Sequence, residues 1–127
     1  MKIAVTVRFQ NSYFSGSLPQ VACALARTLA QAGHDVSLLY PKGEADWFVD
    51  VPTYATALPP RIPTGTTSRY DTVLEVVWQL SPEDRKRYAN QVIYFVHYPA
   101  VFYDMESSVY HWNPLRRNFT NLSAIWT

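Results

Sequence analysis

The sequence predicts an α/β domain, a three-layer α/β/α fold with a mostly parallel sheet. Short apolar runs of strand length recur at residues 3–7, 36–40, 71–78 and 91–96. A segment with helical spacing lies between the first two runs, and a second helix start precedes the last. Strands that alternate with helices are typical of a parallel sheet with right-handed crossovers. The carboxyl ends of the strands then share one edge, where open α/β sheets bind ligands.

Length and composition favour a single globular domain. The chain has 127 residues, of which 48% are hydrophobic and 17% charged, enough to bury a sizeable core. Its 11 basic and 10 acidic residues leave a net charge of +1, and no basic run accompanies the aromatic residues. Nucleic acid is therefore not an expected partner.

The sequence also indicates in which cellular compartment the protein is expected. Cys23 is the only cysteine, which excludes an internal disulfide and favours a reducing compartment. The chain shows no signal-peptide core and no apolar stretch near the ~20 residues of a spanning helix. We expect a cytoplasmic protein, with peripheral membrane contact left open.

The first strand, residues 3–7, leads into a polar and aromatic loop at residues 8–16. Ser17 can cap the next helix, with Gln20 completing a capping box. Apolar residues then recur every three or four positions, as on a helix packed against a sheet: Leu18, Val21, Ala22, Leu25, Ala26, Leu29 and Ala32. Cys23 is expected on this face. Gly33 provides a left-handed residue to end the helix before the second strand.

Prolines at positions 52, 59, 60 and 63 interrupt any periodicity in residues 42–69. We expect this segment to be irregular, with one short strand at 47–51. Residues 71–78 predict the third main strand. Residues 81–84, Ser-Pro-Glu-Asp, have the cap, proline and acidic residues of a helix start. That helix is expected to reach about Asn90 and lead into the strand that ends at His97.

Beyond Pro99 we expect a helix through Met105, an aromatic loop to Trp112 and a helix over residues 114–121. Residues 122–127 are apolar and predict the start of another strand. The fold is therefore expected to be incomplete at the C-terminus and to belong to a longer polypeptide.

Candidate site residues lie in the loops expected at the carboxyl edge of the sheet, which are residues 8–17, 78–80 and 97–104. The free amides at the helix start near Ser17 suit a phosphate, and Gly16 permits close backbone approach. His97 has the chemistry to accept a proton or to hydrogen-bond a sugar, or it is a structural histidine at the edge of the core.

The sequence leaves the roles of several residues open. Asp104 could orient His97, bind a hydroxyl or cap a helix. Glu75 lies within the third strand and either points to the edge or pairs with a buried base. His34, at a helix end, is expected to be structural. The aromatic residues either form an exposed patch for an acceptor, a lipid surface or a partner, or pack in the core: Tyr98, Phe102, Tyr103, Tyr110 and Trp112.

Two cofactor classes are disfavoured. The first loop lacks the three-glycine fingerprint of dinucleotide-binding proteins, and the second strand ends in Tyr40-Pro41 where a ribose-binding acid is usual. No cysteine and histidine cluster has metal-ligand spacing, so no metal is expected.

Several stretches resemble the amino-terminal domain of retaining GT-B glycosyltransferases. Gly16-Ser17 before a helix, and Gly33-His34-Asp35-Val36 at the second strand, are similar to the glycine-containing loop and Gly-His-x-Val motif of that family. Residues 70–73 and 92–99 continue the resemblance over most of the chain except residues 42–69. His97-Tyr98-Pro99 with Asp104-Met105 resembles a stretch of family 4 type mannosyltransferases that extend lipid-linked oligosaccharides.

The resemblance implies a Rossmann-like, acceptor-side domain of a hexosyltransferase. Gly16 and Ser17 would approach the donor diphosphate, although many family members have a second glycine in place of Ser17. His97 would be catalytic and contact the transferred sugar near the reacting carbon. The acceptor, a glycan or a lipid-linked sugar, would be bound by residues that follow the first and last main strands: Tyr13, Tyr98 and Asp104.

The resemblance also implies a C-terminal donor-binding domain that holds the nucleotide sugar through paired glutamates, with no metal or other cofactor. Without that domain this chain is expected to be inactive and open to self-association. Two rival functions remain: a non-catalytic protein-interaction module of the same fold, or another nucleotide-binding α/β enzyme.

Overall fold

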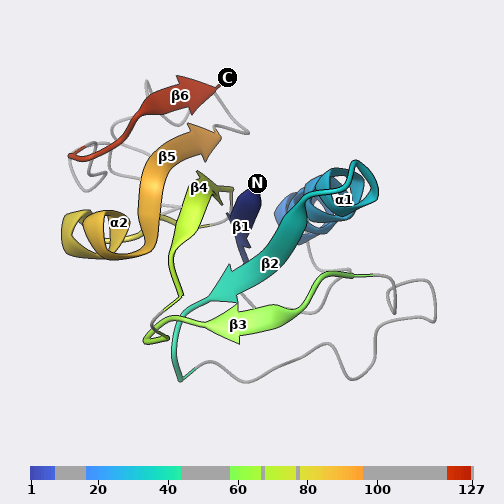
Figure 1. Ribbon diagram of the computed structural model, residues 1–127, viewed down its shortest axis with the longest axis horizontal. Coiled ribbons are helices and arrows are strands. Elements are labelled where there is room, and N and C mark those ends of the chain that lie inside the picture. Colours follow the sequence, from blue (N-terminus) through green and yellow to red (C-terminus); the bar gives the residue numbers. More distant parts are fainter. Residues whose placement is uncertain (8–16, 44–57, 67, 77, 96–119, 127) are drawn as a thin grey trace.

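The computed structural model describes residues 1–7, 17–43, 58–66, 68–76, 78–95 and 120–126, which contain a six-stranded parallel sheet and two helices (Figure 1). The strands are β1 (Lys2–Thr6), β2 (Asp35–Tyr40), β3 (Arg61–Pro63), β4 (Tyr70–Glu75), β5 (Ala89–Phe95) and β6 (Ala124–Trp126). The helices are α1 (Ser17–Gln31) and α2 (Pro82–Tyr88). The predicted α/β class is confirmed.

The sheet has the strand order β3-β2-β1-β4-β5-β6, and every neighbouring pair is parallel. β1 lies in the middle, where Val5 is paired with Leu38 of β2 and Leu74 of β4. From β1 the chain winds outward to β2 and β3, then returns to the other side of β1. The order therefore reverses between β1 and β4, the kind of switch point at which doubly wound sheets bind ligands.

The two helices cover opposite faces of the sheet, as Figure 1 shows. One core cluster joins alternate strand residues to the buried face of α1: Ile3, Val5, Leu74, Ala22 and Ala26. The other joins the intervening strand residues to α2: Ala4, Val73, Val92 and Tyr88. Successive side chains of a strand point to opposite faces, so the central strands contribute to both clusters and the domain has three layers.

The predicted end of α1 is confirmed at Gly33, which has a φ of 96°. The amide of Gly33 donates to the carbonyl of Ala30, and the amide of His34 donates to that of Leu29. These bonds satisfy the last carbonyls of the helix. The next amide, of Asp35, donates to the carbonyl of Met1 and starts the pairing of β2 with β1.

The structure corrects the expectation that residues 42–69 are irregular, because β3 lies within them. The Leu38 amide donates to the Pro60 carbonyl, and the Thr64 amide donates to the Tyr40 carbonyl. Pro63 has no N–H to donate, but among the described strands β3 is the outer one and pairs with β2 alone, so the proline is tolerated there. The predicted strand at 47–51 lies outside the described residues.

Several other predictions about the elements differ from the structure. β4 ends at Glu75, not at Trp78, and α2 ends at Tyr88 because Ala89 takes an extended conformation and opens β5 directly. Ala32, expected on the buried face of α1, is exposed beyond the end of that helix. At the end of the predicted helix over residues 114–121, Thr120 and Asn121 form a turn.

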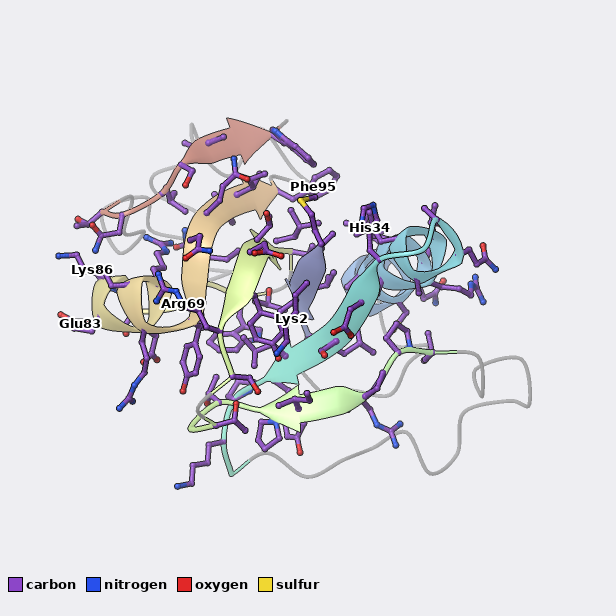
Figure 2. The ribbon with its side chains drawn as sticks, viewed as in Figure 1. Lys2, His34, Arg69, Glu83, Lys86 and Phe95 are labelled. Atoms are coloured by element: carbon purple, nitrogen blue, oxygen red, sulfur yellow. The ribbon has the colours of Figure 1, made fainter. Side chains whose placement is uncertain are left out.

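Arg69 holds the carboxyl end of α2. Its Nη1 donates to the Lys86 carbonyl at 2.7 Å, its Nη2 donates to the Ala89 carbonyl at 3.1 Å, and its Nε donates to Asn90 Oδ1 at 2.9 Å. Figure 2 shows Arg69 beside this helix. The guanidinium thus bonds carbonyls at the negative end of the helix dipole.

Gly33→Ala is expected to lower the free energy of unfolding by about 1 kcal/mol or slightly more, because an L-residue is strained at this φ. A Cβ added at Gly33 meets no atom within 4 Å, so the cost is in the backbone alone. Gly33→Asn is the control, since asparagine tolerates positive φ and should lose less. Urea denaturation measures both, and equal losses would argue against backbone strain.

Candidate functional site

The carboxyl ends of β1, β4 and β5 lie next to one another because these neighbouring strands are parallel. Residues 8–16 follow Val7 at this edge, and residues from 96 onward follow Phe95, which Figure 2 labels at the end of β5. α1 ends at the opposite, amino edge, where the amide of Asp35 meets Met1. A helix of 15 residues spans about 22 Å, so its start at Ser17 lies toward the carboxyl edge.

Most of the predicted site residues lie outside the described residues. These are Gly16, His97, Tyr98, Asp104 and Tyr13, and their roles stay predictions. Ser17 was expected to cap α1 and is instead the first residue of that helix. The fold thus brings together, at one edge of the sheet, the elements that flank Gly16 and His97.

Trp78 lies against the carboxyl end of β1, at the switch point. Its indole Nε1 donates to the Val7 carbonyl at 2.7 Å, and its own carbonyl accepts from Thr6 Oγ1 at 3.0 Å. The same Thr6 oxygen accepts from the Val76 amide at 3.0 Å. Residues 78–80 were predicted at this edge, and the position of Trp78 is confirmed. The hydrogen bonds of Trp78 were not predicted, because a tryptophan after a strand carries no signal for its acceptor.

Glu75 at the end of β4 pairs with a buried base, the second of the two alternatives that the sequence left open. Its Oε1 accepts from Arg85 Nη2 at 2.7 Å, and its Oε2 accepts from Arg85 Nε at 2.9 Å and from the Leu80 amide at 3.0 Å. Both charged side chains are 0% exposed. The forked geometry satisfies both carboxylate oxygens.

The electrostatics of this pair are those of a structural contact. Burial raises the pKa of the Glu75 carboxyl, and the hydrogen bonds and charge of Arg85 oppose the rise together with the Leu80 amide. Arg85 Nη1 is directed elsewhere and donates to the Thr120 carbonyl at 2.7 Å. Solvent reaches neither side chain, and the pair holds β4, α2 and the chain before β6 together.

Cys23 is buried in α1 against the sheet, on the face predicted for it. Burial raises the pKa of its thiol to about 11, and the positive charges of Arg27 and Arg61 oppose the rise. The thiol is therefore neutral at physiological pH, and it is inert as a nucleophile because the thiolate is the reactive form.

His34 lies at the amino edge of the sheet, beside the end of α1 (Figure 2). Its Nδ1 is 3.2 Å from the amine of Met1. The position agrees with the structural role expected for it and separates it from the carboxyl edge.

Within the described ranges no group of three or more histidine, cysteine, aspartate or glutamate residues is placed to hold a metal ion. In the same part of the chain no helix has the length and apolar character needed to cross a membrane. Comparisons with protein-family models, curated proteins and solved structures gave no match to this chain. The functional conclusion therefore rests on its residues and fold.

Arg85→Met is expected to lower the free energy of unfolding by about 3–5 kcal/mol, because it leaves the buried Glu75 carboxylate without its charge partner. The double variant Glu75→Gln/Arg85→Met should recover part of this loss, since glutamine is neutral and still accepts from the Leu80 amide. Chemical denaturation compares the three proteins. A double variant no more stable than Arg85→Met would show that the unpaired charge is not the cause.

The Cys23 thiol should make stability fall at high pH. Its pKa in the folded protein is about 11, above the ordinary value of 9.0, so its contribution is complete below pH 9 and is lost as the pH rises through 11. At pH 10 the loss relative to pH 8 should be about 1 kcal/mol. Cys23→Ala should lack this component in urea denaturation at the two pH values. A parallel fall in both proteins would assign it to other groups.

Proposed function

We propose that this chain is the acceptor-side domain of a GT-B-type glycosyltransferase, which transfers a sugar from a nucleotide-sugar donor to a glycan or a lipid-linked acceptor. The observation that supports the proposal most is the common edge of β1, β5 and the start of α1. The segments that carry Gly16 and His97 both adjoin that edge. The resemblance of these segments to the GT-B family suggests the roles of Gly16 at the donor diphosphate and of His97 at the transferred sugar.

In this proposal the domain contributes to catalysis by positioning the donor and the acceptor. The first amides of α1, next to Gly16, face the donor diphosphate and stabilise its negative charge. His97 contacts the transferred sugar, and Tyr13, Tyr98 and Asp104 orient the acceptor hydroxyl. A donor-binding domain supplies the other wall, and bringing the two substrates together provides much of the rate.

An enzyme that binds a dinucleotide has less support, even though the strand order is the one typical of that class. β2 ends in Tyr40 where such an enzyme has an acidic residue for the ribose. A non-catalytic protein-interaction module remains the rival function, and a sugar-transfer assay distinguishes it from a glycosyltransferase.

The test is a sugar-transfer assay on the full-length protein with a panel of nucleotide-sugar donors and glycan or lipid-linked acceptors. Transfer from at least one donor is the expected result. Absence of transfer across the panel, with a protein that is folded and binds another protein through this domain, would favour the interaction module.

In the active protein His97→Ala should lower turnover by about 100-fold or more, the usual effect of losing a residue at the reacting centre, with little change in unfolding free energy. His34→Ala is the matched control, because this histidine lies at the opposite edge. Its turnover should equal that of the unmodified protein. Similar losses of turnover and stability in His97→Ala would indicate that His97 has a structural role.

A further inference from the structure

The segment of residues 120–126, here called the β6 unit, is attached to the domain largely by polar contacts. Thr120 O accepts from Arg85 Nη1 at 2.7 Å, and Asn121 Nδ2 donates to the Pro82 carbonyl at 3.0 Å. Ser123 exchanges two bonds with Val92: its amide donates to the Val92 carbonyl at 2.8 Å, and its Oγ accepts from the Val92 amide at 3.0 Å. These contacts join the unit to α2 and β5.

The apolar attachment of the β6 unit is weak by comparison. β6 has three residues and, among the strands that the structure describes, it lies at the outer position of the sheet and pairs with β5 alone. Ile125 and Trp126 are 45% and 47% exposed. Leu122 and Ala124 contact the two core clusters and are themselves only partly buried. Segments with few buried apolar contacts open at a lower free energy than the core strands.

Within the described residues, Arg85 contacts the β6 unit from a fully buried side chain. Two of its nitrogens are held by Glu75, which leaves Nη1 aimed at Thr120 O. The contact of Asn121 is exposed, where water competes for the same groups. Charge-assisted bonds shielded from water are the stronger kind.

We propose that the β6 unit opens and closes as one piece while the other five strands stay folded, and that Arg85 holds the closed form. Opening leaves β5 as the outer strand, with a free row of backbone groups that can pair with another strand. The proposal stands on these contacts alone and does not depend on the proposed transferase activity.

Native-state hydrogen exchange followed by NMR on the full-length protein tests the proposal. The amides of Val92 and Ser123 report on opening, because each is bonded across the junction. The amides of Val7 and Val76 are references, since they bond within the centre of the sheet. The two reporters should exchange faster than the two references, at rates that agree with each other.

Arg85→Lys is the informative variant, because lysine keeps a positive charge beside Glu75 but lacks the fork that also reaches Thr120. It should speed exchange of both reporters by about tenfold or more, the effect of losing one charge-assisted bond, while the references are unchanged. Arg69→Lys is the matched control, with the same chemical change at the other end of α2. It should leave the reporters unaffected.

Asn121→Gly provides an independent variant if Arg85→Lys does not fold. Glycine accepts the φ of 64° at this position and removes only the bond to Pro82, so a roughly two- to fivefold acceleration is expected. Reporters that exchange at the reference rate in the unmodified protein would overturn the proposal. Equal acceleration by Arg69→Lys and Arg85→Lys would do the same.

Discussion

The buried ion pair between Glu75 and Arg85 is the contact on which the second half of the described fold depends. It joins the end of β4 and the entry to α2, which are close in the sequence, to the chain before β6, which lies 35 residues beyond Arg85. A charged pair in the interior is not by itself a strong source of stability, because both ions lose their hydration. The pair instead fixes the geometry of the fold. The Arg85 guanidinium bonds to defined acceptors and so allows one arrangement of the three elements, where an apolar contact would allow several.

The sheet combines the strand order of dinucleotide-binding domains with different chemistry at its carboxyl edge. The centre of that edge is held by Thr6, Val7 and Trp78, which bond to one another and to the chain after β4. We propose that a ligand at this edge is recognised mainly by the loops that follow β1 and β5, the segments that carry Gly16 and His97 in the sequence. A shared fold does not by itself imply a shared ligand.

The two outer strands differ in how they are kept in place. β3 carries Arg61 and Pro63, a charge and a proline of the kind that discourage pairing with other chains. β6 carries exposed Ile125 and Trp126 and is attached by polar bonds from its turn. Few contacts of β6 bury apolar surface, in contrast to those of a core strand. The release of β6 is therefore expected to remove little of the apolar packing that stabilises the core.

The sequence by itself determined the elements whose signals are local: the central strands from their apolar runs, α1 from its spacing, its end at Gly33, and the start of α2 from its cap. It also placed the loops after the strands at one edge, because parallel strands joined by right-handed crossovers leave no other arrangement. Only the tertiary structure decided the partner of Glu75, the bonds of Trp78 and the strand at Arg61–Pro63. Each depends on groups brought together by the winding of the chain, and a contact between residues distant in sequence leaves no periodicity in it.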